Sequence, residues 1–296
     1  MIGIDWGSSG FRAYLLADDG DILDTRTAPR GIMALKPEDY PRVLREEIGD
    51  WLKRPGEMLL LSGMVGSRQG WREAPYGDCP AAIADLVPKL CPVETESGKA
   101  FIVPGLTCRT ADGLPDVMRG EEVQIFGALE NDGEDAVFCL PGTHSKHVIV
   151  RGGRIERFAT SMTGEVFAHL RQHGLIAAML PREPGPSDEA AFREGVARSG
   201  TAGGLLHHLF GIRTQRLFDE LAAEAAPDYF SGLLIGHELR SSHWPGGSVR
   251  IIGASDLAGR YRLAFRHLGI AAEIAPEHAA ARGLYRIGCL LAGERA

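Results

Sequence analysis

The chain opens with short apolar runs separated by small polar turns. Residues 1–5 and 11–16 are apolar, and the intervening turn, 6–10, is rich in glycine and serine. This pattern predicts a β-hairpin, and a further turn at 18–20 before the run 22–26 predicts a third strand with no helix between them. A dinucleotide-binding Rossmann unit passes from its glycine turn into a helix, so this order argues against such a unit.

The same order of runs and turns recurs near the middle of the chain. The apolar run 136–140 is followed by the turn 141–145 and the strand-like run 146–150, and a second turn at 151–153 leads into 154–158. Two strand-turn-strand-turn-strand segments in one chain predict an internally duplicated architecture.

Helices and strands alternate over the remainder of the chain. Helical periodicity predicts helices over 41–52, 120–129, 164–173, 187–195, 215–226, 256–268 and 277–291, and short apolar runs predict strands over 58–61, 233–235 and 249–252. This alternation indicates an α/β fold. The polar cluster at 131–135 predicts a boundary between an N-terminal domain, 1–130, and a C-terminal domain, 131–296, whose last helix can pack back on the first domain.

Composition narrows the class of protein. With 296 residues and 44% hydrophobic content the chain can form two cores, and its net charge of -7 with interspersed signs argues against a nucleic-acid partner. The five cysteines form no CxxC pair, which indicates a reducing compartment without a zinc site. No run resembles a membrane span or a signal peptide, so we expect a cytoplasmic protein without a membrane partner.

Small residues with a nearby charge mark the turn of each hairpin. Asp5 precedes the first turn, where glycine and serine allow backbone N–H groups to approach a phosphate and the carboxylate can hold Mg²⁺. The second turn, 142–145, carries hydroxyl groups and is followed by Lys146. Two such loops can clamp one polyphosphate from opposite domains. The alternative is that both are tight hairpins only.

A nucleotide must be held without a P-loop, because no GxxxxGK[ST] sequence occurs. The segment 249–259 offers an apolar strand, a turn at Gly253, Ala254 and Ser255, and a helix start. A base or ribose can lie against that turn, although a plain strand-to-helix connection has the same pattern.

A glycine-rich loop after the run 58–61 brings four polar or aromatic side chains together: Ser67, Arg68, Gln69 and Trp71. Arginine can grip a carboxylate with two hydrogen bonds, and an aromatic face packs against a carbon chain. The loop therefore favours a sugar acid over a neutral sugar, unless Arg68 is a surface ion-pairing residue.

The two turns and the GAS strand together resemble the phosphate-1, phosphate-2 and adenosine motifs of the actin, heat-shock 70 and hexokinase superfamily. The strings IGIDWGSSGFRAYLL, LSGMVGSRQGW, DVMRGEEVQIFGAL, LPGTHSKHV and TSMTGEVFAHL resemble successive signature segments of the 2-dehydro-3-deoxygalactonokinase family, across nearly the whole chain. The resemblance implies a two-lobed, actin-like (ribonuclease H-like) ATPase fold with duplicated mixed-sheet domains around a nucleotide cleft. It also implies ATP- and Mg²⁺-dependent phosphorylation of the 6-hydroxyl of 2-dehydro-3-deoxy-D-galactonate, a small-molecule substrate of galactonate catabolism.

The resemblance assigns roles to particular residues. The expected nucleotide-binding residues are Asp5, Gly7, Ser8, Ser9, Arg12, Gly142, Thr143, His144, Ser145, Lys146, Gly253, Ala254 and Ser255, with Asp5 also the metal ligand. Sugar kinases of the superfamily place a carboxylate base before a helix upstream of the second hairpin, where this chain has Glu121, favoured, then Asp116 and Glu122. Glu165 matches a glutamate that contacts substrate hydroxyls. Either glutamate of the helix head, and Glu165, can alternatively be helix-start carboxylates.

Two other functions fit the same residues. One is a kinase of this fold for another sugar or sugar acid, and the other is a non-catalytic nucleotide-binding regulator. Release of ADP on addition of the acceptor separates a kinase from a regulator. The pairs His207 and His208, and His237 and Glu238, lack a metal-ligand partner at useful spacing and are interpreted as structural.

Overall fold

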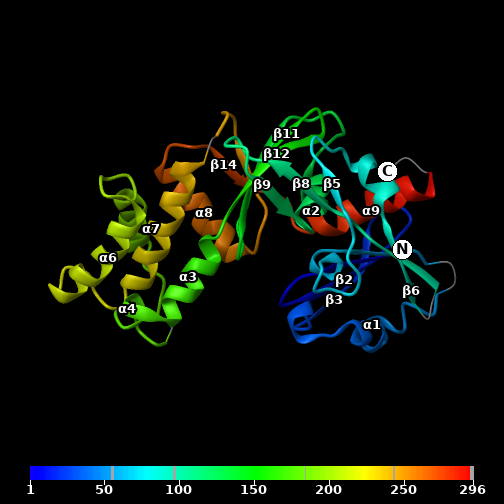
Figure 1. Ribbon diagram of the computed structural model, residues 1–296, viewed down its shortest axis with the longest axis horizontal. Helices are drawn as coiled ribbons and strands as arrows, with labels where there is room; N and C mark the ends of the chain where they lie inside the picture. Colours follow the sequence, from blue (N-terminus) through cyan, green and yellow to red (C-terminus); the bar gives the residue numbers. More distant parts are fainter. Residues whose placement is uncertain (55–56, 96–97, 184, 243, 294–296) are drawn as a thin grey trace. The chain divides into compact units, whose positions relative to one another are not determined.

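The computed structural model describes residues 1–54, 57–95, 98–183, 185–242 and 244–293. The chain forms two compact units, and it passes between them more than once (Figure 1). The first unit comprises Met1–Ala136, Val148–Phe158 and Ala275–Ala296, and the second comprises Val137–His147 and Ala159–Ile274.

The first unit contains a six-stranded sheet in the order β3-β2-β1-β4-β7-β6. Its strands are β1 Ile2–Trp6, β2 Phe11–Leu16, β3 Ile22–Ala28, β4 Leu59–Ser62, β6 Cys91–Thr95 and β7 Gly98–Ile102. Strand β1 is antiparallel to β2 and parallel to β4, with Asp5 opposite Ser62. This register places the carboxyl ends of β1 and β4 side by side.

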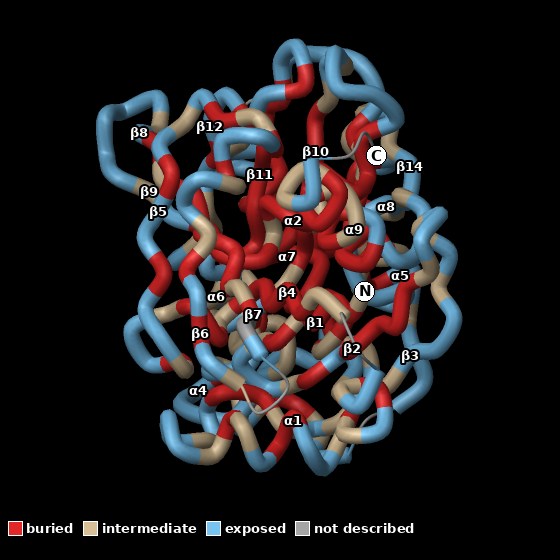
Figure 2. Tube along the Cα trace, turned by 90° about the vertical axis from the view of Figure 1, so that its right-hand side faces the viewer, coloured by how far each residue is buried: buried red, intermediate tan, exposed pale blue. Residues whose placement is uncertain are grey.

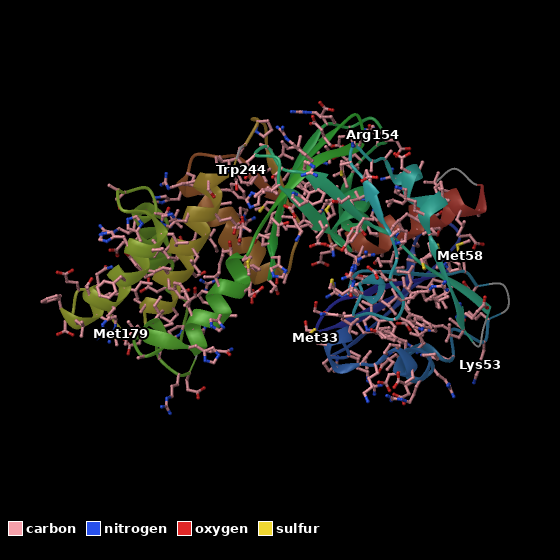
Figure 3. All side chains as sticks on the ribbon, viewed as in Figure 1. Met33, Lys53, Met58, Arg154, Met179 and Trp244 are labelled. Carbon is pink, nitrogen blue, oxygen red and sulfur yellow. The ribbon has the colours of Figure 1, made fainter. Side chains whose placement is uncertain are left out.

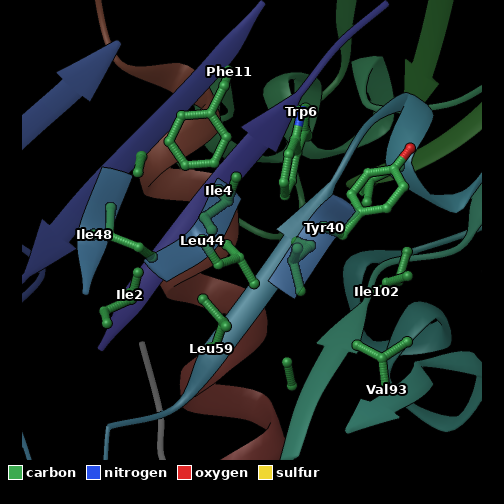
Figure 4. Close-up of a cluster of buried hydrophobic side chains, with 14 of the residues drawn as sticks. Ile2, Ile4, Trp6, Phe11, Tyr40, Leu44, Ile48, Leu59, Val93 and Ile102 are labelled. Atoms are coloured by element: carbon green, nitrogen blue, oxygen red, sulfur yellow. The ribbon is translucent and has the colours of Figure 1, made fainter. Parts of the chain in front are cut away.

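A hydrophobic cluster beneath this sheet fixes the first hairpin (Figure 4). Trp6 is fully buried, with Phe11 edge-on at 4.8 Å and Tyr40 at 4.9 Å between ring centroids. Tyr40 begins helix α1, Tyr40–Ile48, whose apolar face lies in the same cluster. The tube in Figure 2 is red, hence buried, along much of β1 and β4. Because Trp6 stands between Asp5 and the glycine turn, this core holds both in place.

The rest of the first unit consists of short elements and two helices. A three-stranded sheet has the order β5-β8-β9, with β5 Tyr76–Asp78, β8 Gly105–Arg109 and β9 Pro115–Met118. The helices are α2 Glu121–Ala128 and α9 Ala279–Ala292. Single turns of 3-10 helix occupy Ile32–Ala34, Pro37–Asp39 and Met64–Gly66, and a longer one Ile83–Lys89.

A five-stranded sheet follows the order β12-β11-β10-β13-β14. Its strands are β10 Ala136–Leu140, β11 Ser145–Arg151, β12 Arg154–Ser161, β13 Val249–Ile251 and β14 Ala272–Ile274, with β10, β13 and β14 mutually parallel. The order β12-β11-β10-β13 repeats the order β3-β2-β1-β4 of the first sheet. This repeat confirms the predicted duplication.

Helices make up most of the second unit. They are α3 Thr163–Gln172, α4 Gly174–Ala177, α5 Glu189–Arg198, α6 Gly204–Leu217, α7 Ala226–Ser241 and α8 Ser255–His267. Among the described residues, none of the helices combines the length and apolar character that crossing a membrane requires.

Two of the predicted elements are wrong, and both fall near α7. Most of the predicted helix over 215–226, residues 218–225, is the loop that joins α6 to α7, and the predicted strand Leu233–Ile235 lies within α7. Helix α7 buries residues on all its sides, including Leu233, Leu234 and Ile235. A helix without a polar face has no 3.6-residue alternation, so its apolar run resembled a buried strand.

Helices α2 and α9 cross at two glycines. A Cβ atom on Gly127 would collide with the carbonyl oxygen of Ala279, and one on Gly283 would collide with that of Val123. The two backbones are therefore in direct contact, and this contact attaches α9 to the helix that follows the predicted catalytic segment.

Gly127→Ala is expected to lower the free energy of unfolding by about 1 to 3 kcal/mol, because the new methyl group must push α9 away. Urea denaturation followed by circular dichroism measures the change. Gly259→Ala in α8 is the matched control, because nothing lies within 4 Å of the added carbon; alanine there should leave stability unchanged or raise it. Wild-type stability of Gly127→Ala would contradict the close crossing.

Candidate functional site

The turn of the first hairpin is a rigid, exposed loop. The Gly7 N–H donates to the Gly10 carbonyl at 2.9 Å, and Ser8 and Ser9 are exposed. Gly31 packs so closely against the turn that a Cβ atom there would collide with the Ser8 carbonyl. The Ile32 and Met33 N–H groups donate to the Gly7 and Ser8 carbonyls, so the neighbouring segment sets the conformation of this loop.

A pocket of 360 Å³ adjoins this turn. It is lined by Asp5, Gly7, Gly10, Phe11, Arg12, Thr27, Ala28 and Pro29. The predicted residues Asp5, Gly7 and Arg12 thus share one concave surface of the first unit, with the cationic Arg12 opposite Asp5 in the β1–β2 register.

Backbone from two other segments surrounds the Asp5 carboxylate. Gly63, which follows β4, and Gly120, which precedes α2, have φ angles of +89° and +102°. A Cβ atom on Gly120 would lie 2.9 Å from the Gly63 Cα and 4.0 Å from Asp5 Oδ1. Gln124 in the first turn of α2 donates to Asp5 Oδ2 at 3.4 Å. The fold thus brings the head of α2 to the end of β1.

Burial raises the pKa of Asp5 to about 6. The Arg12 guanidinium opposes this shift, the Glu121 carboxylate adds to it, and the Gln124 hydrogen bond opposes it. A carboxyl group with a raised pKa beside a second carboxylate favours binding of a cation, because the cation relieves the repulsion between them.

The three candidate bases occupy different environments. Glu121 is partly exposed at the head of α2, near enough to raise the pKa of Asp5, and its Oε2 accepts the Arg119 backbone N–H at 3.0 Å. Glu122 is fully buried, and its two oxygens accept the Gly120 N–H at 2.9 and 2.8 Å. Asp116 lies on β9 opposite Cys108 and accepts the neighbouring Val117 N–H at 2.7 Å. The geometry therefore favours Glu121 of the three.

Glu122 is a helix-capping residue held in its neutral form near neutral pH. Burial raises its pKa to about 8, and the charge of Glu121 adds to the shift, while the hydrogen bond from Gly120 and the Arg119 charge oppose it.

The four residues of the predicted sugar-acid loop differ in their exposure and contacts. Trp71 stacks parallel to Tyr40 at 5.5 Å and packs on the core. The Arg68 side chain is 87% exposed, with its Nε 3.6 Å from Glu73, and Gln69 is exposed. Their roles toward a substrate stay predictions.

Two buried polar groups lie close to this loop without a partner in the described part of the chain. They are Ser67 Oγ and the guanidinium nitrogens Nε and Nη1 of Arg119. Ser67 was among the expected residues. Sequence reasoning missed Arg119 although it stands directly before the Gly-Glu-Glu segment, because a single arginine carries no sequence signal of burial.

The turn of the second hairpin has an exposed tip and a buried base. Thr143 and His144 are exposed, whereas Ser145 and Lys146 are buried. Glu165, at the head of α3, donates its backbone N–H to the Thr143 carbonyl at 2.9 Å, and its carboxylate lies 2.5 Å from His144 Nε2. Glu165 therefore braces this turn, and its predicted contact with substrate stays a prediction.

A buried hydrogen-bond network runs from this turn to α7 and α8. Tyr261 donates to Glu238 at 2.6 Å, the other Glu238 oxygen lies 2.6 Å from His147 Nε2, and Ser145 Oγ lies 2.8 Å from the Tyr261 hydroxyl. Because the single hydroxyl proton of Tyr261 is donated to Glu238, the Ser145 hydroxyl must donate to the Tyr261 oxygen. The Ser145 hydroxyl therefore has no proton left for a phosphate.

The same network accounts for a cluster of metal-ligating residue types. Ligand atoms of Cys139, His147 and Glu238 lie within 4.8 Å of one another. His147 and Glu238 are hydrogen-bonded directly, and Tyr261 uses the second oxygen of Glu238. Both carboxylate oxygens of Glu238 are thus engaged in hydrogen bonds, and its interpretation as structural stays a prediction.

A second pocket, of 220 Å³, lies within the second unit. Its lining includes Gly142 of the turn, Gly164 of α3, Leu234 of α7, and Leu257 and Tyr261 of α8. The predicted residues Gly253, Ala254 and Ser255 are exposed directly before Leu257. The lining of this pocket thus includes Gly142 of the second turn and Leu257, which lies two residues after Ser255 of the GAS segment.

Comparison with known proteins agrees with these features. The sequence profile of a family described as 2-keto-3-deoxy-galactonokinase matches residues 5–287. The chain is 34% identical over 273 residues to 2-dehydro-3-deoxygalactonokinase of Escherichia coli K12, an alignment covering 90% of each chain.

Solved structures show the same fold. A crystal structure from Sinorhizobium meliloti that carries the name 2-dehydro-3-deoxygalactonokinase has a TM-score of 0.88 at 31% identity, with 97% of this chain and 95% of that chain covered. An activator of 2-hydroxyisocaproyl-CoA dehydratase from Clostridium difficile, solved with ADPNP, has a TM-score of 0.53 at 12% identity, covering 99% and 96%. These similarities and the repeated sheet order confirm the predicted actin-like α/β fold.

Glu122→Gln is expected to gain stability over the wild type as pH rises. The Glu122 carboxyl group has a pKa of about 8 in the folded protein, above its ordinary 4.5. Its contribution to the stability of the fold is therefore complete below the ordinary pKa and is lost as the pH rises through the folded pKa. Glutamine cannot ionise, and its oxygen can still accept the Gly120 N–H.

Urea midpoints of both proteins at about pH 5 and about pH 8 measure this effect. The exposed-site variant Glu94→Gln corrects for the change in net charge. A midpoint difference that does not grow with pH would show that Glu122 is ionised in the folded protein.

Proposed function

Because the chain belongs to the 2-keto-3-deoxy-galactonokinase family, we propose that it transfers the γ-phosphoryl group of ATP to the 6-hydroxyl of 2-dehydro-3-deoxy-D-galactonate. This proposal rests on one observation: Asp5 lies beside the head of helix α2, which carries Glu121. Both residues belong to the segment that matches the family. A small-molecule acid and ATP are then its partners.

Each unit supplies one turn suited to phosphate. In the first unit, the exposed residues Ser8 and Ser9 and the Arg12 side chain can donate to phosphate oxygens. In the second unit, Thr143 and His144 form the exposed tip. The pocket beside Gly142 is suited to the nucleoside, since side chains of three helices line it and several of them, such as Phe167, Leu234 and Leu257, are apolar.

Magnesium fits the residues around Asp5. Mg²⁺ prefers hard oxygen ligands and usually keeps several waters. Burial and the Glu121 charge destabilise the Asp5 carboxylate, and Arg12 compensates only in part, so a bound cation would stabilise it. When bound, the ion would neutralise charge on the phosphates. Asp5 is the residue that would hold it, directly or through water.

Glu121 is the proposed base. As the 6-oxygen attacks the γ-phosphorus, an O–P bond forms, the bond to the β-phosphate oxygen breaks, and ADP leaves; the hydroxyl proton passes to Glu121. The Arg119 backbone N–H donates to Glu121 Oε2 and thereby orients the carboxylate.

The direct test is ADP release from the purified protein with ATP, Mg²⁺ and 2-dehydro-3-deoxy-D-galactonate. Glucose, an amino sugar and gluconate-derived 2-dehydro-3-deoxy acids serve as competing acceptors. Preference for a competitor would replace the proposed substrate, and nucleotide binding without acceptor-dependent ADP release would indicate a regulator.

Glu121→Gln is expected to lower kcat by about 10²- to 10⁴-fold, because the amide cannot take the proton. ATP affinity should remain close to wild type. Glu122→Gln and Asp116→Asn, assayed in parallel, should retain most of their turnover. Near-normal kcat in Glu121→Gln with a large loss in Asp116→Asn would move the base to Asp116, and activity in all three would make Glu165 the next candidate.

The KM for Mg-ATP should rise as pH falls below about 6, because protonation of Asp5 removes the carboxylate that binds the cation. Asp5→Asn should start with a high KM that no longer changes over this range. Initial-rate measurements across that interval test the assignment, and a wild-type KM that stays constant would exclude Asp5 as the group that binds Mg-ATP.

A further inference from the structure

Arg119 is a buried cation in the first unit. It lies between β9 and α2 and is only 7% exposed. Its guanidinium lies over the Tyr76 ring at 4.4 Å from the ring centre, and its Nη2 donates to the Ala74 carbonyl at 2.8 Å. One of its five N–H bonds is thus used.

The other nitrogens of this guanidinium are buried without a partner. Nε and Nη1 make no hydrogen bond to any described residue. The nearby Glu122 does not compensate the charge near neutral pH, because burial raises its pKa to about 8. Burying a charged donor without a partner is costly, so such a group is retained where a ligand satisfies it.

The loop after β4 packs closely against the Arg119 guanidinium. A Cβ atom on Gly66 would lie 2.9 Å from Arg119 Nη1, so glycine permits this approach. Ser67, the next residue, also has a buried hydroxyl without a partner among the described residues. Arg119 and Ser67, which follows the glycine that contacts Arg119, thus both have buried donors without a partner among the described residues, in contrast to the widely exposed Arg68.

We propose that Arg119, assisted by Ser67, binds the carboxylate of the acceptor. A planar guanidinium with four unused N–H bonds can bind a carboxylate through two parallel hydrogen bonds, and a hydroxyl can donate a third. Arg119 is two residues from Glu121 and donates its backbone N–H to it, so one short segment fixes the spacing of acid anchor and base. The assignment rests on the proposed function and makes Arg119 a residue that determines specificity for acids.

The Tyr76 ring, on strand β5, covers one face of the guanidinium and is itself 38% exposed, whereas Nε and Nη1 are buried. Because the N–H bonds lie in the plane of the guanidinium, a carboxylate must approach them from its edge, and the residues that bury Nε and Nη1 must move to admit it.

The test compares the acid with its methyl ester, which keeps the sugar and removes the charge. The wild type should prefer the acid in kcat/KM by at least about 100-fold. Arg119→Gln should raise KM for the acid by about 100-fold while leaving kcat/KM for the ester nearly unchanged, so that the preference disappears. Arg109→Gln, an exposed arginine that also donates to a backbone carbonyl, is the matched control and should keep the preference.

Other outcomes would overturn the assignment. An equal loss toward acid and ester in Arg119→Gln would make the residue structural, and loss of the preference in Arg68→Ala alone would move the anchor to Arg68. Should Arg119→Gln not fold, Arg119→Lys decides: lysine lacks the planar fork, so a folded lysine variant with undiminished preference would contradict the proposal.

Failure of the proposed function gives a different result. In that case the wild type releases no ADP with the acid, and Arg119 is then tested by binding alone. Pyruvate, as a simple 2-oxo carboxylate, should raise the melting temperature of the wild type and not of Arg119→Gln; no shift in the wild type would reject the carboxylate site as well.

Discussion

Direct backbone contact around Asp5 is the constraint on which the first unit depends. Gly63 and Gly120 both have left-handed φ angles, and neither has room for a side chain. Through this contact the end of β4, the head of α2 and the first hairpin meet at one carboxylate. The sheet register sets the position of Asp5, and the Trp6 core fixes its orientation. The arrangement of the site therefore depends on two glycines that have no side chain to take part in its chemistry.

In the second unit, side-chain hydrogen bonds hold a turn in position where the first unit uses direct backbone contact. Its hairpin turn is braced by Glu165 from α3 and by the buried network from Ser145 through Tyr261 to Glu238. A backbone contact fixes the position of a turn by steric exclusion. A hydrogen-bond network fixes it because each group must keep its role as donor or acceptor. Helices α7 and α8 are thereby coupled to the turn, and a change in either helix alone would leave a buried carboxylate or hydroxyl unsatisfied.

The sequence predicted those elements whose formation depends on residues close together in the chain. Both hairpins, α2 and α8 were expected near their observed positions, since each has clear turn residues or an amphipathic period. Helix α7 was missed because it is buried on all sides, and the small sheet formed by β5, β8 and β9 because its strands are short. At the site, the sequence indicated Asp5 and Glu121. It could not reveal that Arg119 is buried, because that burial depends on Gly66 and Tyr76 from a distant segment.

Each unit contains a buried cysteine whose chemical modification would show when that unit opens. Cys139 is fully buried in the second unit, and burial raises the pKa of its thiol well above the ordinary value; Cys289 is buried on α9 of the first unit. Alkylating reagents attack the thiolate, so both should stay unmodified until the surrounding structure opens. Because the two residues belong to different units, their modification rates would show whether the units open together or one at a time, which the unfolding of the whole chain does not reveal.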